Sequence, residues 1–154
     1  MRIQQLSVTV FKTRSKRVND TDGHTHPGPE HDSSEAMLTI TTDDGQSGYS
    51  FGSPEALRPY VLETFLKKVL LGQDPMDRER LWQGLARWQR GSGANLTDRT
   101  ICTAEMALWD LAGRVLDIPV WKLLGGYRDS VPAYGSTMCG DEMENGLATP
   151  EDYG

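Results

Sequence analysis

The stretch AEMALWDLAGR at residues 104–114 decides the fold, because its apolar residues recur at the 3.6-residue period of an α-helix. Thr97-Asp98 precedes it with a capping hydroxyl, and Asp117-Ile118-Pro119 follows with a proline that cannot continue a helix. We therefore predict one long helix between these signals, in which Gly113 permits another backbone to approach closely. The residues predicted on its buried face are Ile101, Leu108, Leu111, Ala112 and Val115.

On the C-terminal side, a short turn through Trp121, Leu123 and Leu124 ends at Gly125-Gly126, where glycine permits a sharp change of direction. Residues 131–136, VPAYGS, then have the pattern of a new strand. Residues 149–152, TPED, have the hydroxyl, proline and acids of a helix N-terminus, yet the chain stops at residue 154 with no helical turns to repay nucleation. We therefore expect a truncated chain, with a natural disordered tail as the alternative.

Two shorter helices are predicted before the long one. The first begins at Ser53-Pro54-Glu55, a capping hydroxyl followed by proline at the first helical position, and it is closed by Gly72. The second begins at residues 74–77, DPMD, and ends at Gly91-Ser92-Gly93. Apolar residues at helical spacing are Leu57, Tyr60, Val61, Phe65, Val69 and Leu70 in the first helix and Leu81, Leu85 and Trp88 in the second.

The N-terminal third has the two-residue period of strands. Residues 2–11 alternate polar and apolar side chains, as on a half-buried strand. Residues 36–40 alternate likewise and run into TDDG at residues 42–45, where Asp-Gly suits a tight hairpin turn, with Tyr49 and Phe51 on the return strand. Strands followed by helices predict an α+β domain, a three-stranded antiparallel meander followed by a helical block.

Residues 12–34 separate the first strand from the hairpin and have no periodicity, which predicts a long loop. The segment is rich in Asp, Gly, His, Pro and Ser. Its three histidines are His24, His26 and His31. A zinc site at these histidines is disfavoured, because their spacing is not that of a common zinc motif and no cysteine joins them. A solvated loop without a ligand is the plainer interpretation.

Composition sets the broad class of protein. The 154 residues are 37% apolar and 25% charged, which suits a soluble domain with a real core. A net charge of −6 argues against a nucleic-acid-binding face. No stretch has the apolar length of a signal peptide or a membrane span, so a cytoplasmic location is expected. Cys102 and Cys139 have no metal or redox spacing, and we predict that Cys102 is a buried free thiol.

Residues 104–114, followed by Ile118-Pro119 and by LLGG at residues 123–126, resemble the mandelate racemase and muconate lactonizing enzyme branch of the enolase superfamily. In that family a pattern like A-x-W-D-x-x-G-[KR], then proline and L-L-G-G, closes the capping domain, and a strand like residues 131–134 opens a (β/α) barrel. The resemblance covers essentially the whole chain. It implies a capping (lid) domain at residues 1–126 and the start of an incomplete (β/α) barrel at residues 127–154.

The resemblance also implies a chemistry, in which a proton is abstracted next to a carboxylate and Mg²⁺ stabilises the resulting enediolate. The family's metal ligands and bases lie on barrel strands beyond the first, so we assign no catalytic residue and no metal ligand in this sequence. Mg²⁺ is expected in the complete enzyme and not in this fragment, which we predict to be inactive alone. By resemblance, the lid contacts substrate through the loop holding His24 and His26 and through a turn around Tyr49, Ser50 and Phe51.

The favoured function is therefore the lid and substrate-specificity domain of an acid-sugar dehydratase. A racemase or cycloisomerase of the same superfamily is one alternative, and a free-standing, non-catalytic α+β binding module is another. The expected partners are a small carboxylate or sugar-acid substrate and, in the complete enzyme, further copies of the same chain. Neither nucleic acid nor membrane is expected.

Overall fold

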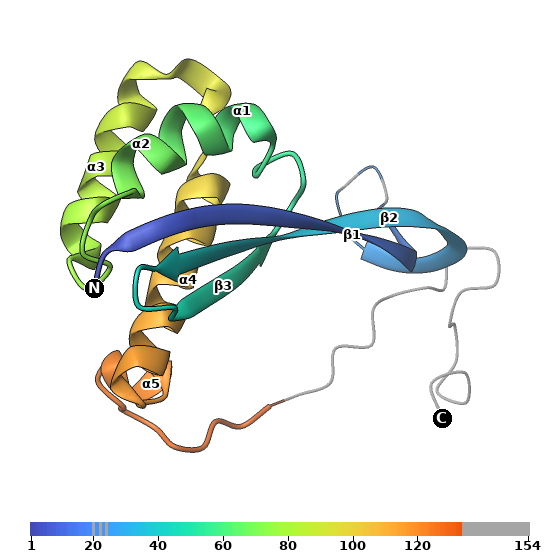
Figure 1. The fold of residues 1–154 in the computed structure, drawn as a ribbon. Coiled ribbons are helices and arrows are strands. Elements are labelled where there is room, and N and C mark those ends of the chain that lie inside the picture. The colour runs from blue at the N-terminus through green and yellow to red at the C-terminus, as the bar shows by residue number, and fades with distance from the viewer. Residues whose placement is uncertain (20, 22, 24, 134–154) are drawn as a thin grey trace. The chain divides into compact units, whose positions relative to one another are not determined.

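The computed structural model describes residues 1–19, 21, 23 and 25–133, and it contains a three-stranded sheet with the order β1-β2-β3. The strands are β1 (Ile3–Asn19), β2 (Thr25–Thr42) and β3 (Ser47–Gly52), and neighbouring strands run in opposite directions (Figure 1). The chain divides into two compact units. The first comprises residues 1–11 and 34–127, and the second comprises residues 12–33 with residues from 128 onward.

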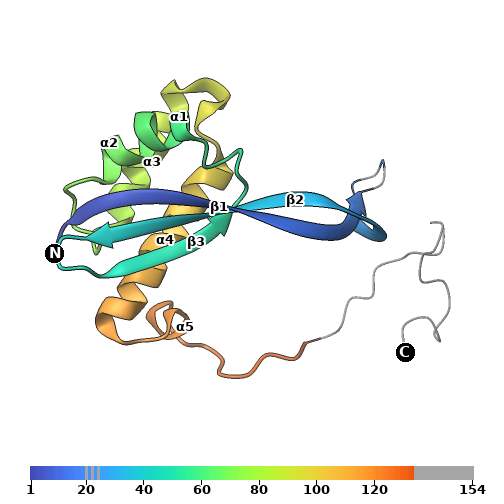
Figure 2. The same cartoon turned by 45° about the vertical axis from the view of Figure 1, so that its right-hand side comes forward.

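The helices follow the strands in sequence, which confirms the predicted α+β class. A first helical segment consists of α1 (Pro59–Val61), a π-helical turn η1 (Leu62–Leu66) and α2 (Lys67–Leu70). It is followed by α3 (Arg78–Gly91), a short 3-10 turn η2 (Gly93–Asn95), the long α4 (Asp98–Leu116) and α5 (Val120–Leu123). Figures 1 and 2 both show α4 lying against the sheet, where it packs on β3.

The hydrophobic core lies between the sheet and the helices of the first unit. On α4, Ile101, Leu108 and Leu111 are buried, as the spacing predicts, and Val115 is half-buried. Strand β2 contributes every second residue and each helix contributes one face, because side chains alternate across a strand and form a stripe along a helix. The main contributors are Ile3, Leu6, Leu38, Ile40, Leu57, Leu66, Leu70, Leu81 and Leu85.

Glycine makes the contact between β3 and α4 possible. A Cβ atom at Gly48 would lie 2.4 Å from both the Ala107 carbonyl oxygen and the Leu111 nitrogen. A Cβ atom at Gly113 would lie 3.0 Å from the carbonyl oxygen of Ile118, on the segment that leads into α5. The close approach predicted at Gly113 is therefore present, and a tighter one occurs at Gly48.

Both ends of α4 carry the signals that the sequence predicts. Thr97 is the N-cap, and its Oγ1 accepts a hydrogen bond from the Thr100 N–H at 3.2 Å. Asp117 ends the helix with a left-handed backbone (φ 52°), which lets the Ile118 N–H donate to the Gly113 carbonyl at 2.9 Å. The glycines of the following sharp turn, at positions 125 and 126, also have positive φ angles.

The hairpin around residues 42–45 is confirmed. β2 and β3 are antiparallel, with pairs running from Thr41–Ser47 to Ala36–Gly52. Gly45 has a φ of 85° and donates its N–H to the Thr42 carbonyl at 3.0 Å, so glycine supplies the backbone angle that this turn needs. The register places Leu38 and Ile40 in the core.

The predicted loop at residues 12–34 is wrong for most of its length. β1 continues to Asn19 and β2 already begins at Thr25. Within the second unit, Arg14 pairs with Glu30 at 2.7 Å and with Asp32 at 2.8 Å. Polar and charged side chains line these strand segments, so the apolar alternation that reveals a half-buried strand is missing from the sequence.

The start of the first helix also differs from the prediction. Ser53 Oγ accepts a hydrogen bond from the Ala56 N–H at 3.2 Å, but this bond closes a single turn, and residues 54–57 are not helical. Arg58 is extended (ψ 152°), because the residue before a proline avoids the helical region. The helix therefore begins one proline later than predicted, at Pro59.

Two further predictions concern the surface and the C-terminal segment. Cys102 is exposed on α4, so the prediction of a buried thiol is wrong; its neighbours Ile101 and Thr103 take the buried positions. Residues 131–133 are not in a strand, and the rest of the predicted strand and the helix start at residues 149–152 lie outside the described residues. No helix among the described residues is long and apolar enough to cross a membrane.

Candidate functional site

Tyr49 and Phe51 lie on the same face of β3, because alternate residues of a strand point the same way. Their side chains are 39% and 62% exposed, whereas Ser50 between them is buried. The segment that the resemblance gave as a turn is thus a strand, paired with β2 up to Gly52. A large aromatic pair exposed to solvent is typical of a surface that receives a ligand or another protein surface.

The aromatic pair borders an open depression of about 540 Å³, which we call the aromatic depression. Three elements build it: β3, the middle of α4, and the segment of α5. The lining is mostly apolar, so the depression suits the apolar part of a ligand or a covering surface. Its lining residues are Tyr49, Ser50, Phe51, Met106, Trp109, Asp110, Val120 and Leu124.

Two charged residues of α4 hold Tyr49 in place. Asp110 Oδ2 accepts hydrogen bonds from the Tyr49 backbone N–H at 2.9 Å and from Arg114 Nε at 2.8 Å. The hydrogen bond to Asp110 raises the pKa of Arg114 above its ordinary value. The Arg114 guanidinium lies over the Tyr49 ring, 4.3 Å from the centroid, as a cation–π contact.

Phe11 joins the aromatic pair from β1. Its ring centroid lies 6.3 Å from that of Phe51 with the ring planes tilted by 43°, a favourable offset geometry. Sequence reasoning missed this residue, although Phe11 ends the alternating segment 2–11 and is bulky and exposed. It also gave Asp110 and Arg114 no role of their own. Their i, i+4 spacing on a helix was the available signal of a linked pair.

The described structure does not test the predicted role of the histidines at this site. His24 lies outside the described residues, and His26 lies in β2 with a side chain that is not described. His31 is exposed, with its Nδ1 3.2 Å from the Pro29 carbonyl oxygen. Substrate contacts by His24 and His26 therefore stay predictions, as do those by Tyr49 and Phe51.

The part of the chain that the structure describes holds no group of three or more His, Cys, Asp or Glu side chains that could bind a metal ion. The described residues therefore do not fit a magnesium site. This finding concerns the described residues alone, and the assignment of no catalytic group to the sequence stays a prediction.

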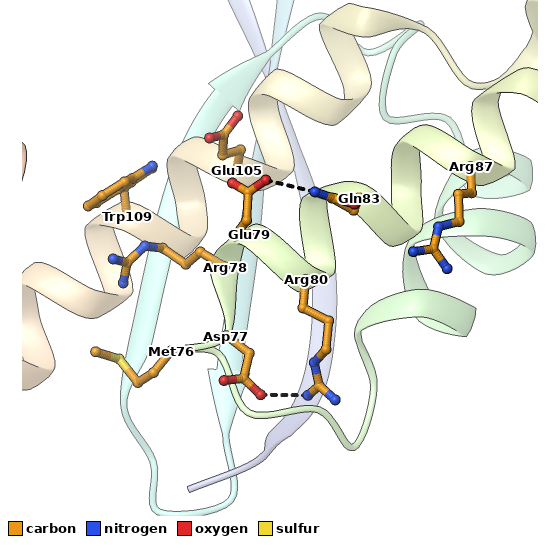
Figure 3. A pocket seen from close by; sticks show the side chains of 9 residues that line it. All are labelled: Met76, Asp77, Arg78, Glu79, Arg80, Gln83, Arg87, Glu105 and Trp109. Carbon is orange, nitrogen blue, oxygen red and sulfur yellow. Dashed lines mark hydrogen bonds and ion pairs between the residues drawn. The ribbon is translucent and has the colours of Figure 1, made fainter.

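A second cavity, of about 710 Å³, lies between α3 and α4 (Figure 3). Its wall includes Trp109, which also lines the aromatic depression. The Arg78 guanidinium lies 3.9 Å from the centroid of the Trp109 ring. Unlike the aromatic depression, this cavity is lined mainly by charged side chains.

Comparison with solved structures identifies close relatives of this fold. D-glucarate dehydratase from Agrobacterium tumefaciens, solved in complex with magnesium, is 63% identical; the match covers 100% of this chain and 40% of that one, with a TM-score of 0.89. The 3,6-anhydro-D-galactonate cycloisomerase from Zobellia galactanivorans is 27% identical over 81% of this chain and 32% of its own, with a TM-score of 0.62.

Comparison with curated sequences also finds dehydratases of sugar acids. D-galactonate dehydratase from Cronobacter sakazakii is 36% identical over 126 residues, which are 77% of this chain and 32% of that protein. A D-galactonate dehydratase family member from Pseudarthrobacter chlorophenolicus is 38% identical over 112 residues, 68% of this chain and 26% of that protein. The chain thus spans about a third or less of the length of these curated relatives.

The family model that matches describes the N-terminal domain of mandelate racemase and muconate lactonizing enzyme, and it matches residues 7–125. That range ends at the glycine pair after α5 and includes the aromatic depression with the Asp110–Arg114 pair. This chain belongs to the mandelate racemase / muconate lactonizing enzyme family of the enolase superfamily, and its residues 7–125 form the N-terminal domain of that family.

Proposed function

We propose that this chain is the N-terminal lid and substrate-specificity domain of an enzyme that dehydrates an acid sugar. The observation that carries the proposal is the 63% identity to D-glucarate dehydratase across the whole chain. The two D-galactonate dehydratase relatives support the same substrate class. All three relatives are longer than this chain, so the reaction belongs to the longer protein.

In this proposal the described residues bind and shield the substrate and do not carry out the chemical step. A proton is removed next to a carboxylate, and the base that removes it lies outside the described residues. Because these residues do not fit a metal ion, we place the magnesium outside them as well. We further infer a homo-oligomeric, cytoplasmic enzyme whose partner is a small sugar acid.

Tyr49 and Phe51 are the residues that we assign to the substrate. Their exposure lets them cover bound substrate, and covering excludes water, which strengthens polar interactions beneath. The Asp110 hydrogen bond to the Tyr49 backbone and the Arg114 contact to its ring fix that aromatic side chain in advance. His24 and His26 are assigned to the distal hydroxyls or carboxylate of the substrate.

A chimera tests this proposal. Residues 1–133 would replace the matching segment of the Agrobacterium D-glucarate dehydratase, whose fold is close enough for the exchange. We expect Mg²⁺-dependent dehydration of glucarate within about tenfold of the parent enzyme. Phe51→Ala in the chimera should lower kcat/KM by about tenfold or more, because about 1.4 kcal/mol of lost contact corresponds to a factor of ten.

Leu71→Ala is the matched control, since Leu71 is exposed and lies outside both cavities. It should leave kcat/KM unchanged. A chimera that folds with native secondary structure and binds Mg²⁺ but has no dehydratase activity would refute the proposed lid function. Equal rates for the Phe51 and Leu71 variants would refute only the assignment of Phe51.

A cycloisomerase is the second candidate, because the Zobellia cycloisomerase has the same fold at 27% identity. The nucleotide sequence after codon 154 separates either enzyme from a non-catalytic binding module. A reading frame that continues into a barrel with spaced acidic ligands and Lys-x-Lys-like bases supports an enzyme. A conserved stop codon at related loci supports a non-catalytic binding module instead.

A further inference from the structure

The cavity in Figure 3 contains a guanidinium group without a hydrogen-bond acceptor among the described residues. Arg78 is the first residue of α3, and its Nε and Nη1 atoms are buried and have no partner. The group is held at this place by its stack on Trp109. A buried donor has lost its bonds to water, so leaving it unpaired is costly and a partner is expected.

The carboxylates around the cavity do not supply this partner. Asp77 Oδ2 pairs with Arg80 Nη2 at 2.6 Å, and Figure 3 shows this pair apart from the Arg78 guanidinium. Glu79 Oε1 accepts from the Gln83 amide at 3.0 Å. Glu105 lines the cavity too, but no ion pair joins it to Arg78 in the described part of the chain. The unmatched donors of Arg78 thus have no acceptor among the described residues, and they can bind a group from elsewhere.

We propose that this cavity binds a carboxylate group through Arg78. Its volume of about 710 Å³ lies in the range of small-molecule sites, which is roughly 300–1,000 Å³. A planar guanidinium matches a carboxylate through parallel hydrogen bonds, and stacking on Trp109 limits the motion of that plane.

The charge of the lining selects among anions. Arg78, Arg80 and Arg87 are balanced by Asp77, Glu79 and Glu105, so the lining has no net charge. A phosphate dianion would meet three carboxylates nearby, whereas a single carboxylate needs only one free guanidinium. The site therefore takes a monocarboxylate, and hydroxyl groups on the ligand can donate to Glu79 or Glu105.

Experiment can distinguish two sources of a carboxylate with the same chemistry. The carboxylate is either a free small acid or an Asp or Glu side chain of a second copy of this chain. The assignment of Arg78 does not depend on the proposed dehydratase function, because it rests on the stack and the unpaired donors alone.

Nuclear magnetic resonance of the 154-residue chain tests the site, with sodium acetate as the probe and sodium chloride holding the ionic strength constant. We expect the Arg78 Nε–H and Trp109 indole N–H signals to shift saturably with acetate. If a second copy supplies the carboxylate, the same two signals shift with protein concentration in the absence of acetate. Trp109 also lines the aromatic depression, so either result supports the site only where Arg78→Gln weakens it. The result observed then identifies the source.

Arg78→Gln should weaken the saturable effect on Trp109 at least tenfold, whereas Arg90→Gln, on α3 outside the cavity, should leave it unchanged. If Arg78→Gln does not fold, the shift of the Arg78 Nε–H signal in the wild-type chain decides whether the site binds a carboxylate. No saturable shift with acetate or protein concentration would overturn the proposal. An equal Trp109 shift in Arg78→Gln would also overturn it. So would a shift of the Arg78 Nε–H signal that Glu105→Gln causes without acetate, because Glu105 would then be the partner of Arg78.

Discussion

Gly48 is the residue on which the contact between strand and helix depends. Its missing side chain leaves room for the backbone of α4, and the nearest atoms to a built Cβ belong to the helix backbone and to Leu111. A flexible side-chain end could move aside, but hydrogen-bonded helix backbone cannot do so without separating α4 from β3. The site residue Tyr49 follows directly, so the same contact positions its backbone.

We predict that Gly48→Ala lowers the free energy of unfolding by about 3 kcal/mol or more, at or beyond the upper end of the usual cost of overpacking. The cause is a Cβ atom 2.4 Å from Ala107 O and Leu111 N. Urea unfolding followed by circular dichroism measures the change. Gly91→Ala is the control, because nothing lies within 4 Å of its built Cβ, and it should change stability by about 1 kcal/mol at most. Equal effects of the two substitutions would contradict this account of the β3–α4 contact.

At the scale of elements, α4 ends on a residue type that does not favour its own backbone angle. Asp117 adopts a left-handed conformation (φ 52°) that glycine adopts without steric cost. We expect Asp117→Gly to raise the free energy of unfolding by about 0.5–1 kcal/mol, because the strain at the C-terminal cap is relieved. The midpoint of urea unfolding reports the change, and Asp117→Ala, which keeps a Cβ atom, should not stabilise. A loss of stability in Asp117→Gly would show that the aspartate side chain contributes more than its backbone strain costs.

The elements also show which parts of the fold could be predicted from sequence. The bounds of α4 were predictable because Thr97 and Asp117-Ile118-Pro119 act within one turn of the helix ends. The strands at residues 12–19 and 25–33 were not, because their polar residues give no period. Arg14 meets Glu30 only after the chain has folded back over 16 residues.

The candidate site was predictable to a smaller extent. Tyr49 and Phe51 were identified by resemblance, and the structure places both on the aromatic depression. The partner that holds Tyr49, Asp110, is 61 residues away in the chain. The stack of Arg78 on Trp109 likewise joins two helices, and no local pattern encodes it.

At the scale of the molecule, the first unit exposes several large apolar side chains around the aromatic depression. Phe51, Met106 and Leu124 are each more than half exposed. Contiguous exposed apolar surface drives association unless another surface covers it. In the proposed enzyme, the remainder of the longer protein supplies that cover.

We therefore expect the 154-residue chain to self-associate at micromolar concentrations, as measured by sedimentation velocity. The double variant Phe51→Ser with Leu124→Ser should shift the population toward monomer. Leu71→Ser changes a residue of similar character that is 37% exposed and outside the depression, and it should have no such effect. A wild-type chain that stays monomeric throughout would contradict the expectation.

The Asp110 carboxylate affects the edge of the sheet as well as the position of the Tyr49 ring. In the order β1-β2-β3, the strand β3 is outermost, so its free side is an edge to which a foreign strand could add. The Tyr49 N–H on that side is already taken by Asp110. A fibril could therefore not extend the sheet past β3 without first breaking this bond, so one side chain both orients an aromatic residue and blocks this edge of the sheet.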